Sequence, residues 1–183
     1  MVATQTWISE LSERTKAFDK QAEESFRNLS LAQLNWRPDK DTWSIAQQLH
    51  HMVLANRTYA DVMQNLSESA GTEKGSYGPG FWGKFLLKAV SPEDKLPAPV
   101  PKPLIPTDKP LDHAILDEFL TIQARYHAAV SNLDGKDLNV RFSSPFAKLI
   151  KLKLGDAVQI VALHNERHLG KAFALLERPD FPK

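Results

Sequence analysis

Two histidines, His164 and His168, lie four residues apart in a segment whose apolar residues recur at helical spacing. At this spacing, two imidazoles project from the same face of a helix. The apolar residues of that face are Ala157, Ile160, Val161, Ala172 and Leu175. Both histidines should therefore point into the core, where each ring needs a hydrogen-bond partner or a metal ion. From this pair alone two interpretations stay open: core histidines satisfied by side chains or water, or two ligands of a metal site.

A third histidine on another helix would favour the metal interpretation. In the amphipathic segment 45–66, His50 lies far from the apolar stripe, whereas His51 lies at its edge. His51 is therefore the better third candidate, although a histidine at such a boundary can also extend to water. His113 and His127 lie on the polar side of the next long amphipathic segment, and we expect them to be solvated.

Three neutral imidazoles can hold zinc, nickel or iron and leave a coordination position open for water or substrate. The spacing excludes two well-known metal motifs. A zincin helix has glutamate directly after its first histidine, where this chain has Asn165, and Glu166 projects to the opposite face. A ferritin-like di-iron site needs Glu-x-x-His pairs, which this sequence lacks.

Composition limits the class of protein. The 183 residues, 42% hydrophobic and 25% charged, are typical of one globular domain spanning 1–183. Because the chain has no cysteine, any metal ligands must be nitrogen or oxygen atoms. The 23 basic and 22 acidic residues give a net charge of +1, so we expect neither nucleic acid nor a membrane as a partner. The N-terminus lacks the pattern of a signal peptide, which predicts a cytoplasmic protein.

Helical periodicity predicts four long amphipathic helices, over about 6–29, 45–66, 110–133 and 154–177. Ser44 and Gln47 have the spacing of a capping box at the start of the second helix. Strand patterns are almost absent, apart from a little extended structure near 139–142. These elements predict an all-α fold, a four-helix bundle with a long crossover loop between helices 2 and 3, in which ligand sites lie between facing helices.

The crossover, about 67–109, has glycines early and prolines late. Loops of this length in a compact domain are usually functional or mobile. Within it, 81–90 is apolar enough to form a short helix, which could be a lid over the site or a packed part of the crossover. The packed crossover is the favoured interpretation.

Several motifs together resemble a known family. They are Trp43-Ser-Ile-Ala-Gln-Gln-Leu-His-His51-Met, His164-x-x-Arg-His168-Leu-Gly, Trp36-x-Pro38 and the closing Pro179-Asp-Phe-Pro182. In order and spacing they resemble the DinB-like (damage-inducible, YfiT-related) superfamily of metal-binding four-helix bundles over nearly the whole chain. The resemblance implies that His51, His164 and His168 bind nickel, zinc or iron, and that the protein forms a homodimer. It also implies kinship with S-transferases and isomerases that use low-molecular-weight thiols.

The sequence departs from that family in three places. Lys171 stands where a glutamine commonly follows the last histidine motif, and Ser144-Pro145 stands where relatives often have His-Pro. The insertion 71–106 is longer than expected. These departures bear on which substrate the protein accepts more than on whether it binds a metal.

Two functions follow as hypotheses. The first is a metal-dependent enzyme, of the thiol-dependent S-transferase or hydrolase type, that acts on a small-molecule substrate. In it, Arg167 could meet an anionic substrate group or form a surface ion pair, and Asn56 could orient a ligand or fill a polar gap between helices. The second is a non-enzymatic, stress-related metal-binding protein or dimeric scaffold, since no nucleophile or acid-base dyad is recognisable.

Overall fold

The computed structural model describes residues 6–73, 75–94 and 100–183, and most of them are helical. The helices are α1 (Thr6–Phe26), α2 (Leu31–Leu34), α3 (Ile45–Ser69), α4 (Phe81–Val90), the 3₁₀ turn η1 (Lys102–Leu104), α5 (Ala114–Ser131) and α6 (Leu154–Leu176). Strands β1 (Arg141–Ser144) and β2 (Ala147–Lys153) pair antiparallel. The expected all-α fold is thus confirmed in its broad form, with a small hairpin added.

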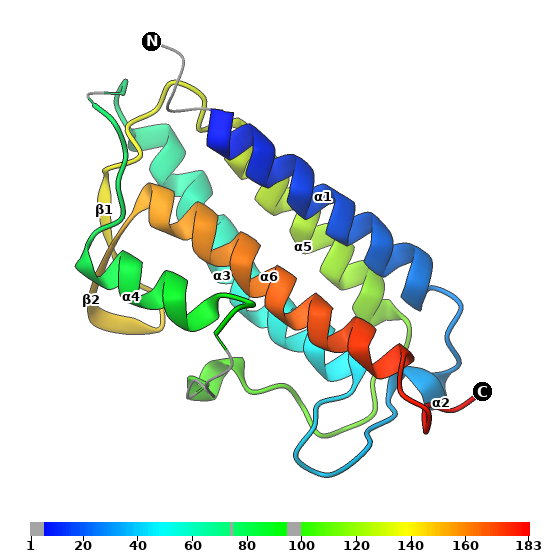
Figure 1. Cartoon of the computed structure of the whole chain (residues 1–183). Coiled ribbons are helices and arrows are strands. Elements are labelled where there is room, and N and C mark those ends of the chain that lie inside the picture. Colours follow the sequence, from blue (N-terminus) through cyan, green and yellow to red (C-terminus); the bar gives the residue numbers. More distant parts are fainter. Residues whose placement is uncertain (1–5, 74, 95–99) are drawn as a thin grey trace.

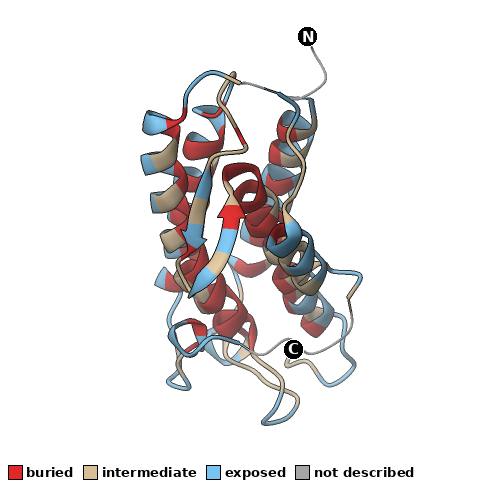
Figure 2. Cartoon of the chain, turned by 90° about the vertical axis from the view of Figure 1, so that its left-hand side faces the viewer, coloured by how far each residue is buried: buried red, intermediate tan, exposed pale blue. Residues whose placement is uncertain are grey.

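The four long helices α1, α3, α5 and α6 lie side by side (Figure 1). Helix α3 packs against α5 and α6, and α1 packs against the same two helices. Taken together, the buried residues of these four helices are mostly apolar, and Figure 2 shows the buried positions in red. This arrangement makes α3 and α6 direct neighbours, although they are far apart in the sequence. Side chains from both can therefore meet in the interior.

Polar side chains fix where the helices begin. The capping box predicted at Ser44 is present, because the Ser44 hydroxyl accepts from the Gln47 amide at 3.2 Å and the Gln47 side chain accepts from the Ser44 amide at 3.1 Å. A second capping box, between Ser30 and Gln33, opens the short helix α2. The chain between Phe26 and Ser30 is therefore a turn, and the first helix ends three residues earlier than expected.

The hairpin before α6 is longer than the sequence pattern predicts, since that pattern indicates only a little extended structure near 139–142. The register pairs Arg141 with Lys153 and Phe142 with Leu152. Leu152 is the only fully buried side chain of β2, and Lys151 and Lys153 flank it in the sequence. A strand this short with one buried side chain gives a weak periodic signal. The hairpin leads without a linker into α6, and so sets where that helix starts.

Helix α4 packs against α6 and β2. A Cβ atom added at Gly83 would lie 2.4 Å from the Asp156 carboxylate, so the α4 backbone lies directly against the first turn of α6. This is the geometry of a packed crossover. The outer face of α4 exposes Phe81 and Phe85. Among the described residues, no helix is both long and apolar enough to span a membrane.

Candidate metal centre

His51 from α3 and His164 and His168 from α6 meet between the two helices. The Nε2 atoms of His51 and His164 lie 3.0 Å apart. One nitrogen from each of the three rings can be chosen so that all three lie within 4.8 Å of one another. The structure thus brings together the three histidines that the sequence analysis selected.

The start of α6 determines where its two histidines lie. The Asp156 carboxylate accepts a hydrogen bond from the Lys153 amide at 2.8 Å and another from the Tyr77 hydroxyl at 2.6 Å. A carboxylate in the first turn satisfies free amides and is favoured by the helix dipole. With the helix begun at Leu154, His164 and His168 fall on the face that packs against α3.

Two of the three rings are held by hydrogen bonds at Nδ1. His51 Nδ1 lies 2.6 Å from the carbonyl oxygen of Leu104, and His168 Nδ1 lies 2.6 Å from the side-chain oxygen of Gln48. Carbonyl oxygens only accept hydrogen bonds, so each Nδ1 carries the proton. In a neutral ring Nε2 then has a free lone pair. Hydrogen bonds of this kind orient metal-binding histidines and raise their basicity.

The contact between His51 and His164 fits a shared cation. Because His51 has its proton on Nδ1, its Nε2 can face His164 Nε2 at 3.0 Å only if His164 donates a proton or both lone pairs meet a cation. Two nitrogens about 2.0–2.1 Å from one metal ion lie about 2.9 Å apart at a right angle and about 3.4 Å apart at the tetrahedral angle. The observed separation of this pair falls in this interval, and the three residues together form a group that could hold a metal ion.

The environment keeps the three rings neutral. Burial lowers the pKa of His164 and His168 well below the ordinary histidine value, and repulsion from the other rings and from Lys171 and Arg167 adds to the effect. Burial also lowers the pKa of His51, although the hydrogen bond to Leu104 opposes this. A metal binds only the neutral ring. The site is therefore in the protonation state that a metal needs at neutral pH.

Access to the three histidines is uneven. His51 and His168 are 3% and 6% exposed, whereas His164 is partly exposed. The Trp43 ring packs against His51 and His168, with its centroid 5.0 Å from that of His51 and 6.1 Å from that of His168. The tryptophan of the sequence motif thus shields one side of the site. Solvent or a ligand would approach on the His164 side.

One of the other histidine predictions is wrong. His127 was expected to be solvated, but its side chain is only 15% exposed and its Nε2 lies 2.8 Å from the Asp19 carboxylate on α1. The helical pattern of α5 alone could not reveal a buried acidic partner on a neighbouring helix. His113 is exposed as predicted, and its Nε2 donates to the carbonyl of Leu29 at 2.7 Å. His50 Nδ1 accepts from the Thr107 amide.

Arg167 and Asn56 have structural contacts. Arg167 Nη1 donates to the carbonyl oxygen of Ser91 at 2.7 Å and also to that of Asp94, which ties the segment after α4 to α6. The Asn56 amide donates to Gln123 at 3.0 Å and to Asn165 at 2.7 Å, inside the core. These contacts match the second interpretation of Asn56, a residue that fills a polar gap between helices.

Two partners of the histidines were missed by the sequence analysis. Gln48 precedes His51 by three residues on α3, so the helical spacing places both on one face and could have identified it. The carbonyl of Leu104 belongs to the backbone of η1, fifty-three positions away from His51. A backbone contact across a long crossover leaves no signal in the residue types.

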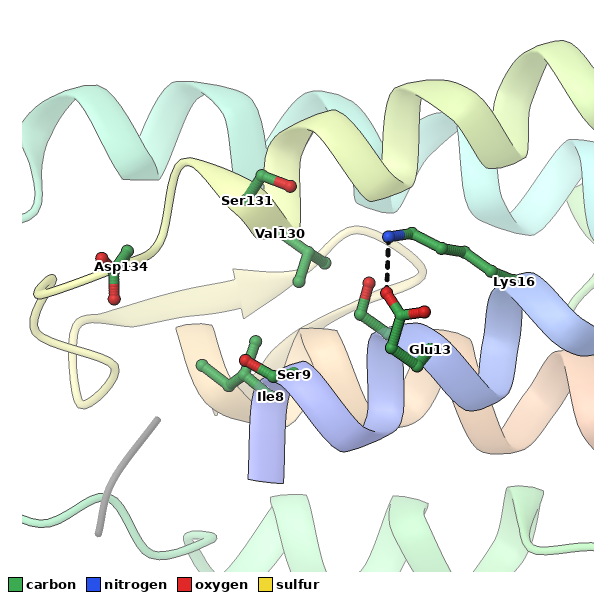
Figure 3. Close-up of a pocket in the computed structure, with 8 residues that line it drawn as sticks. Ile8, Ser9, Glu13, Lys16, Val130, Ser131 and Asp134 are labelled. Atoms are coloured by element: carbon green, nitrogen blue, oxygen red, sulfur yellow. Dashed lines mark hydrogen bonds and ion pairs between the residues drawn. The ribbon is translucent and has the colours of Figure 1, made fainter. Parts of the chain in front are cut away.

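A surface groove elsewhere does not contribute to this centre. Figure 3 shows it between the beginning of α1 and the end of α5, with an ion pair of 2.8 Å between Lys16 and Glu13 at its edge. Its other lining residues include Ile8, Ser9, Val130 and Asp134. None of the three converging histidines lines it.

Comparison with protein families supports the resemblance seen in the motifs. A family model described as the DinB superfamily matches residues 15–172. The chain belongs to the DinB superfamily. The DinB match includes Trp43 and all three converging histidines. Searches of curated proteins and of solved structures gave no match.

Proposed function

We propose that this DinB protein is a divalent-metal-dependent enzyme in which His51, His164 and His168 bind the metal. The main support is the pair of Nδ1 hydrogen bonds, to Leu104 and Gln48, which leave the Nε2 lone pairs of His51 and His168 free in a shielded site. Three neutral ligands also leave coordination positions for a substrate or water. Zinc, nickel and iron all accept such ligands.

A metal bound there would lower the pKa of a coordinated water or thiol, which suits hydrolysis or thiol-dependent S-transfer. The residues of the chain orient and shield the site. Leu104 and Gln48 fix two rings, Trp43 excludes water from one side, and the more exposed His164 side admits the substrate. By family resemblance the proposal includes a low-molecular-weight thiol as substrate, a four-helix bundle and a homodimer. A cytoplasmic location is also part of the proposal.

The small exposure of His51 and His168 also favours a second candidate, a non-enzymatic protein with a structural metal. A structural site is closed by protein ligands, whereas a catalytic site keeps an exchangeable position. The two candidates therefore differ in whether an added ligand reaches the metal. A spectral change of the cobalt-loaded protein on addition of azide or a thiol would support the enzyme, and an unchanged spectrum would support the scaffold.

Metal binding itself is tested by elemental analysis of untagged protein purified without chelators. The variants are His51→Ala and His164→Ala, with His113→Ala as a matched control on the exposed surface. We expect stoichiometric metal in the wild type and the control, and loss of metal in both site variants with helical circular dichroism retained. Wild-type protein that takes up no zinc, nickel or iron after incubation with each ion would contradict the proposal.

A further inference from the structure

Helix α4 carries three aromatic side chains that the rest of the described chain leaves exposed. Phe81 is 77% exposed, Phe85 58% and Trp82 39%. The rings contact one another edge to face, with centroids 5.2 Å apart for Phe81 and Trp82 and 6.1 Å apart for Trp82 and Phe85. They therefore form one continuous apolar surface, the aromatic cluster. A contiguous exposed apolar surface of this kind marks an interaction site.

The hairpin adds a second exposed apolar position beside α4. Strand β2 packs against α4, and Figure 1 shows the two elements next to each other at the edge of the bundle. In β2, Ile150 and Leu152 pack on the core, whereas Leu149 is 93% exposed and Lys151 is also exposed. This alternation is that of a strand with one face on the core and the other toward solvent. The outer faces of α4 and β2 thus belong to one side of the molecule.

The charges on this side of the molecule are all basic. Segments 75–92 and 138–153 contain no aspartate or glutamate, although the chain has 22 of them. The Asp156 carboxylate, which lies against Gly83, is fully buried, and Glu93 follows only after α4 ends. The rest of the chain is therefore net acidic, and the overall charge of +1 conceals a separation of charge. The basic residues of the two segments are Lys84, Lys88, Arg141, Lys148, Lys151 and Lys153.

The lysines of these segments differ in their availability. Lys151 and Lys153 donate hydrogen bonds to oxygen atoms of the protein. Lys84, Lys88 and Lys148 are exposed, and within the described part of the chain they form no ion pair. Two of these three lie on α4 itself, among the aromatic residues. They are cations that an anionic partner can reach.

An anionic lipid surface fits this combination best. Helices that bind at a membrane interface present tryptophan, phenylalanine or leucine together with lysine, and the lysines are attracted to anionic headgroups. A protein partner usually receives such anchors in pockets, whereas Phe81 and Leu149 project into solvent. A second copy that used the same face would bring like charges together.

We propose that the outer face of α4 and of the hairpin binds peripherally to anionic lipid surfaces. Phe81, Trp82 and Phe85 enter the headgroup region, and Lys84 and Lys88 bind lipid phosphates. The sequence analysis expected no membrane partner because the net charge is close to zero, but that total does not describe the local distribution of charge. This inference goes beyond the proposed function and does not depend on the metal centre.

The test is co-sedimentation of the full-length protein with vesicles of two compositions. One is phosphatidylcholine alone, and the other is equal parts of phosphatidylcholine and phosphatidylglycerol. We expect binding to the vesicles that contain phosphatidylglycerol, much weaker binding to phosphatidylcholine alone, and release as salt is added. Lys84→Gln with Lys88→Gln should lower the partition coefficient about fivefold for each lysine. Phe81→Ser with Phe85→Ser should lower it roughly tenfold for each ring.

Each double variant has a matched control at exposed positions elsewhere. Lys16→Gln with Lys20→Gln removes two lysines from α1, and Leu31→Ser with Ile105→Ser removes two apolar side chains that are 50% and 54% exposed. Both controls should bind as the wild type does.

Three results would overturn the proposal. They are absence of binding to either kind of vesicle, equal binding to both kinds, and wild-type binding by the two α4 variants. Analytical ultracentrifugation without lipid distinguishes the other occupant. If Phe81→Ser with Phe85→Ser dissociates a wild-type dimer and leaves vesicle binding unchanged, the face is an interface between copies of the chain and the lipid proposal is wrong.

Discussion

The substitution Gln48→Met isolates the role of the hydrogen bond that holds His168. Methionine nearly keeps the volume of glutamine but cannot accept from His168 Nδ1, which lies 2.6 Å from the glutamine oxygen. Loss of a partner that orients a metal-binding histidine typically weakens metal affinity 10- to 100-fold. This corresponds to roughly 1.4–2.7 kcal/mol. The metal-free protein should also lose about 1–3 kcal/mol of unfolding free energy, because a buried N–H is left unsatisfied.

Competition with a chromophoric chelator measures the affinity, and urea unfolding of the metal-free protein measures the stability. Gln48→Glu provides the opposite perturbation, since a carboxylate is a stronger acceptor and should tighten metal binding. Gln64→Met, at an exposed position of the same helix, is the neutral control. If Gln48→Met binds zinc within twofold of the Gln64→Met control, Gln48 does not orient His168 and the assignment of its tautomer is wrong.

Three further predictions concern stability. Because burial lowers the pKa of His51 and His168, the native metal-free protein binds fewer protons than the unfolded chain below about pH 6.5. Its unfolding free energy should fall as the pH decreases below that value, by up to about 1.4 kcal/mol per pH unit for each histidine. Urea unfolding at several pH values measures this, and an unfolding free energy that does not change with pH would contradict the prediction. Gly83→Ala should destabilise by about 1–3 kcal/mol through the clash with Asp156, whereas Gly170→Ala should be neutral or stabilising in thermal unfolding. Asn56→Leu should cost about 1–3 kcal/mol but leave metal stoichiometry unchanged, and a loss of metal would show that Asn56 supports the histidines.

The long helices were predictable because each carries a sustained apolar stripe. The stripe on α6 placed His164 and His168 inward from sequence alone, and the edge position of His51 selected it over His50. Their convergence depends on α3 and α6 being neighbours, which helical periodicity does not encode. The motif resemblance supplied that information, since it relates the two segments to one family.

Features that depend on contacts between distant segments were not predictable. The partner of His127 is a buried aspartate on another helix, and the partner of His51 is a backbone carbonyl. A helical wheel describes one helix at a time, so it assigned His127 to solvent. The hairpin was underestimated because only Leu152 of its second strand is fully buried, and a single apolar position defines no period.

His51 and His164 are separated by 113 positions along the chain, yet their Nε2 atoms lie 3.0 Å apart. A metal ion bound by both residues would act as a covalent cross-link does, because it would close a very large loop of the chain. For a permanent cross-link over such a loop, the lost freedom of the unfolded chain corresponds to roughly 4–5 kcal/mol. A chain without cysteine has no disulfide to serve this purpose. Coordination of a metal by imidazoles would provide such a cross-link in reducing surroundings, where a disulfide would be reduced. A chelator would remove the metal and so break the cross-link.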